Sequence, residues 1–260
     1  MAPSDSGPES AQNEQPLIAH LLELRDRLLK IVWGVALAFL PLMIFAKELY
    51  AWLAQPLLRM MPEGSSMIAT DVASPFFTPI KLAALVAFIG AMPWVLYQVW
   101  AFVAPGLYKS EKRLVLPLMA SSTLLFYAGM AFAFFLVLPT VFRFIVGVAP
   151  EGVSVMTDIS KYLDFVLGIF LAFGFAFETP VALVLLVKTG FVTPAKLASV
   201  REYVFVGAFV VGAVFTPPDI VSQIMLAVPV YLLYELGIVA ARVLVPQSRE
   251  VERQQSGGSP

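Results

Sequence analysis

The stretch APGLYKSEKRLV at 104–115 separates two long apolar runs, and it decides the topology of the chain. Four charged residues lie close together in it: Lys109, Glu111, Lys112 and Arg113. The flanking runs almost lack charge, and charged side chains are costly inside a lipid bilayer. The stretch is therefore predicted to be a loop at the point where the chain leaves a membrane and meets water.

Composition places the chain in a membrane. Of its 260 residues, 59% are hydrophobic and 13% are charged, and the mean hydropathy is +0.84. A soluble domain has about 25% charged residues, and a spanning helix needs about 20 mainly apolar ones. The apolar runs predict an all-α polytopic membrane protein with six transmembrane helices. The lack of cysteine and the single histidine, His20, exclude disulfides, thiol catalysis and multi-histidine metal sites.

The chain is expected to form one membrane domain between two polar tails. Residues 1–16 are acidic and rich in Pro and Ser, and 246–260 are similarly polar, which predicts disordered cytoplasmic tails. The membrane domain covers 17–245 and starts with an amphipathic helical segment at 17–30, expected to lie at the membrane surface. The six spans are expected at about 31–53, 76–103, 114–145, 163–187, 203–215 and 220–241.

Prolines and span lengths predict the shape of the bundle. Prolines kink helices, and several lie within or near the ends of the spans, which predicts a bent, concave bundle. These are Pro41, Pro93, Pro117, Pro139, Pro180 and Pro229. The fifth span is too short for a bilayer of full thickness, so the last two spans are expected to form a short hairpin around TPPD at 216–219, with local thinning of the bilayer.

The distribution of Lys and Arg predicts the orientation. The two tails, the lead-in segment and the loops at 104–115 and 188–202 carry most of these residues, and Lys and Arg are enriched on the cytoplasmic side of membrane proteins. Both termini are therefore expected in the cytoplasm. Six spans also require the termini to share a side.

Glu178, near the middle of the fourth span, is the functional candidate that the residues indicate by themselves, because an acid within a span is costly. Two interpretations remain open from the residues alone: a structural hydrogen bond between helices, and the proton site of a small-solute secondary transporter. No inverted repeat supports the transporter. No Walker A, HExxH or GxSxG pattern occurs, so an enzyme is not expected.

Other acids also have ordinary structural interpretations. Glu23 precedes Arg27 by four residues, which is the spacing of a helical ion pair. Glu111 could be a solvated loop acid balanced by its basic neighbours. Asp219 could cap the sixth span.

Five stretches of the sequence resemble one family, and they occur in the family's order. The stretches are HLLELRDRLL at 20–29, GSSMIATDVASPFFTPIK at 64–81, YQVWAFVAPGLYKSEKR at 97–113, FGFAFETPV at 173–181 and VGAFVVGAVFTPPD at 206–219. Together they are similar to the TatC family of the twin-arginine protein translocase, from about Leu17 to Leu244.

The resemblance implies a receptor for export precursors that are already folded and carry two adjacent arginines in their signal peptides. It places the protein in the bacterial inner membrane and implies transport driven by the proton-motive force. It also implies that Glu23 and Glu111 bind the arginines. A guanidinium group is planar and suited to bidentate carboxylate contact, whereas lysine offers a point charge. The other residues that the resemblance assigns to this site are Arg25, Phe102, Pro105, Tyr108 and Lys109.

The resemblance also implies partners, namely the single-span subunits TatA and TatB, other TatC copies and the lipid bilayer. Partner helices are expected at the short hairpin, where Ala208 and Gly212 have a small-xxx-small spacing that permits close helix approach. Asp219 and Gln223 are assigned to the same docking region, and Glu178 to the polar lining of a cavity. The expected extracytoplasmic contacts are Met67, Asp71 and Phe76. No cofactor, metal ion or nucleic acid is expected.

Overall fold

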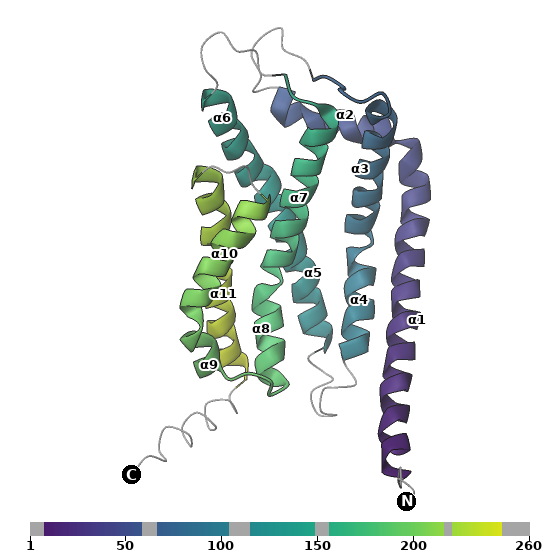
Figure 1. Cartoon of the computed structure of the whole chain (residues 1–260), viewed down its shortest axis with the longest axis vertical. Coiled ribbons are helices and arrows are strands. Elements are labelled where there is room, and N and C mark those ends of the chain that lie inside the picture. The colour runs from purple at the N-terminus through teal and green to yellow at the C-terminus, as the bar shows by residue number, and fades with distance from the viewer. Residues whose placement is uncertain (1–7, 59–66, 104–114, 149–155, 216–219, 246–260) are drawn as a thin grey trace, which may run out of the picture.

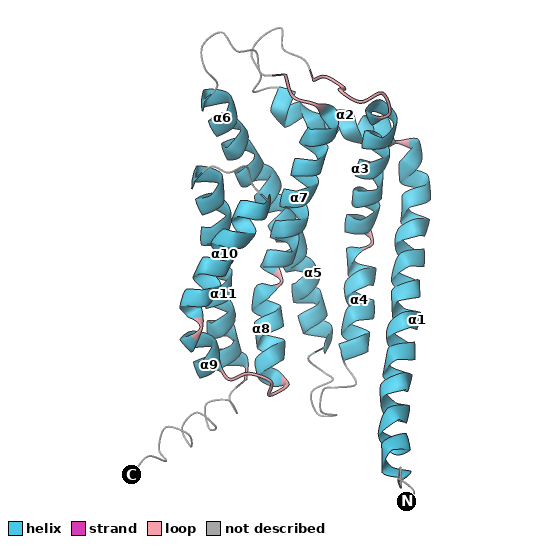
Figure 2. Ribbon diagram, viewed as in Figure 1, coloured by secondary structure: helices cyan, strands magenta, loops and turns pink. Residues whose placement is uncertain are grey.

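The computed structural model describes residues 8–58, 67–103, 115–148, 156–215 and 220–245. The regular elements in these ranges are helices (Figure 2). They are α1 (Pro8–Ile44), α2 (Ala46–Leu58), α3 (Ser74–Gly90), α4 (Met92–Val103), α5 (Val115–Phe132), the π-helical segment η3 (Ala133–Val137), α6 (Leu138–Val148), α7 (Ile159–Phe177), α8 (Thr179–Lys188), α9 (Pro194–Ser199), α10 (Arg201–Phe215) and α11 (Ile220–Leu244).

All of these helices except α2 and α9 belong to six crossings. Four stretches of the described chain are long and apolar enough to span a membrane: His20–Ile44, Leu116–Ile145, Ile159–Lys188 and Gln223–Leu244. Helices α3 and α4 meet the same condition together as one broken span, bent by 53°. Helix α10 has 15 residues and is the short fifth crossing. The predicted six-span all-α fold class is confirmed, although α11, with 25 residues, is a span of full length rather than a short one.

The first crossing differs in extent from the prediction. Helix α1 runs from Pro8 to Ile44 as one helix (Figure 1), so residues 17–30 continue directly into the span instead of turning along the membrane surface. The span ends at Ile44 rather than near residue 53, and α2 lies across that end of the bundle. Residues 8–16 are helical where a disordered tail was expected, since their Glu, Gln and Ala are good helix formers.

The ends of the helices lie at two opposite sides of the bundle. Helix α1 begins and α11 ends at the same side (Figure 1). Helix α4 ends and α5 begins there as well, so both flanks of the charged stretch at 104–115 lie on the side of the chain termini. At the opposite side, the α10–α11 hairpin stops short of the level reached by α6 and α7. This difference in height is consistent with the expected local thinning of the bilayer.

The bend between α3 and α4 is tied to two neighbouring helices. Pro93 has no N–H, so the carbonyl oxygen of Ile89, four residues earlier, lacks its usual helical donor. The Tyr127 hydroxyl on α5 donates to that oxygen at 2.9 Å. On the other side, Trp94 Nε1 donates to the carbonyl oxygen of Lys30 in α1 at 3.1 Å. The proline kink is therefore held between α1 and α5.

Helices α5 and α7 cross at two glycines, one on each helix. The ring of Phe126 lies so close to Gly174 that a Cβ atom there would be 2.7 Å from Cε2 of the phenylalanine. A Cβ atom at Gly129 would collide with the carbonyl oxygen of Phe173. Both phenylalanines are fully buried. Small residues permit such close helix contact in membranes, and this crossing sets the distance between α5 and α7.

Asp158 ties the segment that follows α2 to the start of α7. Its Oδ1 caps α7 by accepting from the backbone N–H groups of Ser160 and Lys161 at 2.9 and 3.0 Å. Its Oδ2 accepts from the backbone N–H and the hydroxyl of Thr70 at 2.8 and 2.7 Å. A short backbone bridge between Ile68 and Asp158 runs beside these bonds.

These hydrogen bonds make the stability of the folded protein depend on pH in the acidic range. The Thr70 hydroxyl, followed by the backbone N–H groups, holds the pKa of Asp158 well below its ordinary value of 3.8. Because the folded pKa is lowered, the stabilisation is complete above the ordinary carboxyl pKa and is lost as the pH falls toward the folded pKa. We expect wild type to unfold at a higher temperature than Asp158→Asn at pH 7, with the gap narrowing below about pH 4. Thermal unfolding in detergent across this range tests it, and a gap that does not change with pH would contradict it.

Candidate functional site

The first candidate site lies where the early part of α1 meets the end of α4. His20, Glu23 and Arg27 share one face of α1, as their spacing predicts, and this face is turned toward α4. The His20 ring stacks on Phe102, with ring centroids 4.3 Å apart and planes inclined by 18°. We call His20, Glu23, Arg27, Gln98 and Phe102 the Glu23 cluster.

The Glu23 carboxylate in this cluster is already paired with the guanidinium group of Arg27. Arg27 donates to Glu23 Oε1 from Nη2 at 2.6 Å and from Nε at 3.0 Å. Its Nη1 donates to Gln98 Oε1 at 3.5 Å. The other carboxylate oxygen, Oε2, lies 4.0 Å from His20 Nδ1, which is beyond hydrogen-bonding distance. The helical ion pair that the spacing suggested is therefore present, and it is also linked to α4.

The carboxylate of Glu23 is partly shielded from water. Its side chain is 35% exposed and that of Arg27 is 21% exposed. Gln98, which closes the cluster on the α4 side, is 3% exposed. A carboxylate in such surroundings attracts a cation more strongly than one in bulk water does. The cluster can therefore bind a guanidinium group in a partly dehydrated setting.

The other residues predicted for this site are distributed differently. Phe102 belongs to the cluster, but the Arg25 side chain is 68% exposed and lies 3.9 Å from Asp26, so the structure does not bring it to the Glu23 carboxylate. Four predicted residues fall in the segment 104–114, outside the described residues: Pro105, Tyr108, Lys109 and Glu111. In the sequence, that segment follows directly on Phe102 and Val103, where α4 ends.

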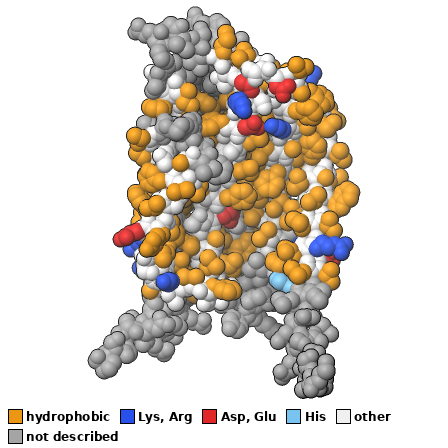
Figure 3. All heavy atoms as spheres, viewed as in Figure 1, with side chains coloured by type: hydrophobic (Ala, Val, Ile, Leu, Met, Phe, Trp, Pro, Cys, Tyr) orange, Lys and Arg blue, Asp and Glu red, His pale blue; other side chains and the backbone are white. Residues whose placement is uncertain are grey.

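Glu178 sits at the break between α7 and α8, beside a pocket of about 270 Å³. The Ser122 hydroxyl on α5 donates to its Oε2, and its Oε1 is buried without a hydrogen-bond partner. The rest of the lining is apolar and comes from α4, α5, α7 and α8. Figure 3 shows atoms of an acidic side chain (red) at mid-height on a face that is otherwise mostly hydrophobic. This arrangement contains the interhelical hydrogen bond that the residues left open, and it places Glu178 in the lining of a pocket, as the resemblance implied.

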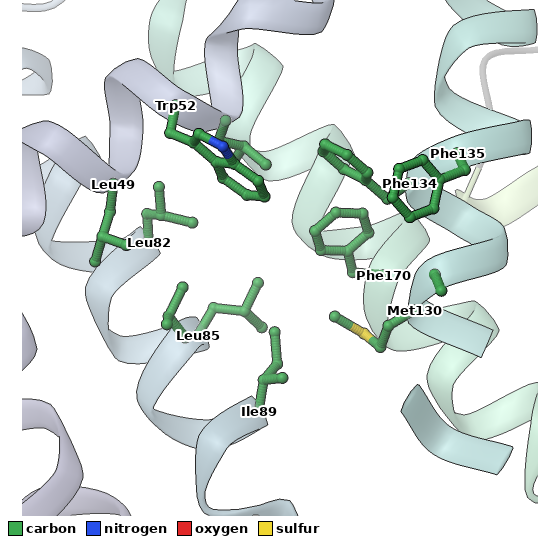
Figure 4. Close-up of a pocket in the computed structure, with 12 residues that line it drawn as sticks. Leu49, Trp52, Leu82, Leu85, Ile89, Met130, Phe134, Phe135 and Phe170 are labelled. Carbon is green, nitrogen blue, oxygen red and sulfur yellow. The ribbon is translucent and has the colours of Figure 1, made fainter. Parts of the chain in front are cut away.

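A second pocket, of about 330 Å³, is lined by residues of α2, α3, α5, η3 and α7, so it shares α5 and α7 with the first. In Figure 4, Leu49, Trp52 and Leu85 point from α2 and α3 toward Met130 and Phe170 on the facing helices. Every residue that lines it is apolar. Both pockets lie between the α3–α4 span and the spans that contain α5 and α7.

The hairpin residues predicted to dock partner helices are largely used inside the protein. Ala208 is 4% exposed, and a Cβ atom at Gly212 would lie 3.3 Å from Cγ of Gln223. Gln223 Nε2 in turn donates to the carbonyl oxygen of Phe209 at 2.9 Å. Gly212 therefore packs on Gln223 of α11, and Ala208 is buried within the chain; docking of partner helices at these two residues stays a prediction. Asp219 lies outside the described residues.

The predicted extracytoplasmic residues differ in exposure. Met67 is partly buried, and its Sδ lies 3.7 Å from the Tyr50 hydroxyl. Asp71 is exposed and accepts from the backbone N–H of Ala73 at 3.0 Å, closing the turn before α3. Phe76 is 67% exposed. Of the three, Phe76 is the best placed to contact another molecule.

The sequence analysis did not single out three polar residues that make structural hydrogen bonds: Gln98, Ser122 and Asp158. Gln98 and Ser122 are polar side chains inside apolar runs, and this was the available signal. Such groups are usually hydrogen-bonded when buried, but the sequence does not say to which helix. Their partners lie 71 and 56 residues away along the chain.

Removing the Ser122 hydroxyl should destabilise the fold through Glu178. In Ser122→Ala both carboxylate oxygens of Glu178 would lack a protein donor in an apolar pocket, and an unsatisfied buried polar group costs about 1–3 kcal/mol. We expect a decrease of that size in the unfolding free energy in detergent. Ser121→Ala is the matched control, because its hydroxyl donates to the Leu118 carbonyl oxygen in its own helix. Equal destabilisation by the two substitutions would contradict the prediction.

Comparisons with known proteins agree on one family. A family model described as Sec-independent protein translocase protein (TatC) matches residues 19–229. The protein of that name from Escherichia coli K12 is 55% identical over 243 residues, covering 94% of each chain. The one from Haemophilus influenzae is 52% identical over 241 residues, covering 93% of this chain and 94% of its own. A crystal structure of the twin-arginine translocase receptor TatC superposes with a TM-score of 0.77 at 40% identity, covering 86% of this chain and 98% of its own.

Proposed function

The chain belongs to the TatC family and is a multi-pass core subunit of the twin-arginine translocase, and from this membership we propose that it is the subunit that binds twin-arginine signal peptides. It is a protein-transport component rather than an enzyme. Its termini would face the cytoplasm across the inner membrane, and the proton-motive force would drive transport. The proton-coupled solute transporter considered from the sequence has no support among these relatives.

The observation that carries the proposal is a partly shielded carboxylate that already holds an arginine. Glu23 accepts two N–H groups from a guanidinium, with donor distances of 2.6 and 3.0 Å. A guanidinium offers several N–H groups in a fixed plane, whereas an ammonium group offers a compact point charge. The same carboxylate should therefore prefer an arginine of a signal peptide to a lysine at the same position.

Glu111 is proposed as the second carboxylate, acting on the neighbouring arginine of the signal peptide. The support is the family resemblance of its surrounding sequence together with the position of α4 and α5, whose ends lie at the side of the bundle that carries the Glu23 cluster. Phe102 would offer an apolar surface next to the arginines. The hollow beside Glu178 would receive an apolar part of the signal peptide or of a partner.

TatA and TatB are proposed to dock on the outer face of α10. Tyr203, Val206 and Val210 are 79%, 61% and 59% exposed, and they lie on the side of the helix away from the buried Ala208. Their spacing of three and four residues gives one continuous apolar stripe on a helix. This stripe lies on the same helix as Ala208 and Gly212, and we propose it as the exposed part of the docking region.

Peptide binding tests the receptor proposal directly. A labelled signal peptide with adjacent arginines and its lysine–lysine variant are titrated against the detergent-purified protein, with fluorescence anisotropy as the readout. We expect the arginine peptide to bind at least about tenfold more tightly, the effect of roughly 1.4 kcal/mol of binding free energy. Equal affinity for the two peptides would contradict the proposal.

A further inference from the structure

The Arg27–Glu23 pair has a geometry that leaves part of the carboxylate available. The two N–H donors of Arg27 that reach Glu23, on Nε and Nη2, are both directed to one oxygen, Oε1, rather than one to each oxygen as in a fork-to-fork pair. The second oxygen, Oε2, lies 4.0 Å from His20 Nδ1. An incoming cation can therefore approach Oε2 before Arg27 has left Oε1.

Arg27 also has a second acceptor nearby. Its Nη1 lies 3.5 Å from Oε1 of Gln98, at the outer limit for a hydrogen bond. Gln98 is 3% exposed and belongs to α4, so its position is fixed by packing rather than by Arg27. Loss of the Glu23 contact would leave the guanidinium beside an amide oxygen that can accept its N–H groups.

We propose that Arg27 is an internal competitor that occupies Glu23 in the free receptor and shifts to Gln98 when an arginine of the signal peptide binds. This inference rests on the proposed receptor function. Because Arg27 must give up the Glu23 carboxylate in the complex, the apparent affinity for the signal peptide is the intrinsic affinity multiplied by the fraction of free receptor in which the ion pair is open. Arg27 therefore weakens the binding of every cationic ligand at Glu23 by the same factor, and it shortens the time for which a precursor stays bound.

The pair also fits the need for release in a transport cycle. A receptor that binds its cargo very tightly dissociates slowly, because affinity differences in related complexes lie mostly in the off-rate. Arg27 lies four residues further along the same helix, so it can re-form the ion pair with Glu23 as the signal peptide leaves. Release would then need no change in the fold of α1.

Replacing Arg27 by glutamine tests the inference. Exposed or partly exposed ion pairs contribute about 0.2–1 kcal/mol, so we expect the affinity for the arginine peptide to rise about 1.5-fold to fivefold. The affinity for the lysine peptide should rise by the same factor, leaving the ratio between them unchanged. A fall in affinity, or no change, would overturn the inference, since both outcomes assign Arg27 a structural or supporting role.

Two further variants separate competition from a general change in charge or structure. Lys30→Gln removes a positive charge one turn further along α1, outside the Glu23 cluster, and it measures the non-specific gain; a gain equal to that of Arg27→Gln would overturn the inference. In a Glu23→Gln background, Arg27→Gln should no longer raise the affinity, because the contested carboxylate is gone. A persisting gain there would also overturn it.

Gln98→Leu tests the second half of the exchange. The shifted Arg27 would lose its acceptor in the bound state, so both peptides should bind more weakly than to wild type. Unchanged affinity would overturn the assignment of Gln98 as the receiving group. Failure of the receptor proposal is recognised separately, because in that case wild type itself does not distinguish the arginine peptide from the lysine peptide.

Discussion

Replacing Glu23 by glutamine is expected to lower the affinity for a signal peptide with adjacent arginines by about tenfold to a hundredfold. Glutamine keeps the size of the side chain and one carbonyl oxygen but removes the charge. Hydrogen bonds to charged groups contribute about 1.5–3 kcal/mol, and the shielded position of Glu23 favours the upper part of that range. Titration of the labelled peptide onto the detergent-purified variant measures the loss.

In Glu23→Gln, the affinity for the lysine–lysine peptide should fall by a smaller factor, because an ammonium group makes fewer directed contacts with the carboxylate. The preference for arginine should therefore shrink together with the affinity. Asp26→Asn is the matched control: it removes one negative charge from the same helix, and its side chain is 64% exposed and lies beside Arg25. We expect less than about a twofold change there, since exposed pairs contribute little. A comparable loss in both variants would mean that only net charge matters.

Replacing Gly129 by alanine is expected to destabilise the bundle by about 1–3 kcal/mol, the usual cost of overpacking. The added Cβ atom would collide with the carbonyl oxygen of Phe173 and approach the ring of Phe177 to 2.9 Å. A backbone carbonyl cannot swing away as a side chain can, so α5 and α7 must separate. Unfolding by a denaturing detergent, followed by circular dichroism, measures the change in unfolding free energy.

The control is Gly207→Ala, at a glycine within α10 where an added methyl group would have no neighbouring atom of the described chain within 4 Å. There the substitution should be neutral or slightly stabilising, because alanine loses less backbone entropy than glycine in a helix. Gly129→Ala should also weaken the bond between Ser122 and Glu178, which bridges the same two spans. Equal stability of the two glycine variants would contradict the close crossing of α5 and α7.

The sequence predicted the fold class because the signals involved are local. Apolar runs identify spanning helices through the cost of exposed backbone in lipid, and Pro93 and Pro180 lie beside two of the helix breaks (Figure 2). The extent of the first span was harder to predict from the sequence. An amphipathic segment such as 17–30 has the same periodicity whether it lies on the membrane or packs on another helix, and here its polar face packs on α4.

The candidate sites were predictable only in part, for a related reason. The shared face of His20, Glu23 and Arg27 follows from helical spacing, but the partners Gln98 and Phe102 come from another span. Ala208 and Gly212 show the opposite case. Their spacing indicates close helix contact without saying whether the contacting helix belongs to another subunit or, as the structure has it for Gly212, to α11 of the same chain.

The most direct test of the receptor assignment is to map where the two arginines of a bound signal peptide lie. A peptide with a photo-reactive group next to its arginine pair is bound to the purified protein and activated, and the labelled segments are identified by mass spectrometry. The account predicts labelling around His20, Glu23 and Arg27 in α1 and around Gln98 and Phe102 in α4, reduced in Glu23→Gln. Labelling confined to α10 and α11, or labelling that Glu23→Gln leaves unchanged, would contradict it.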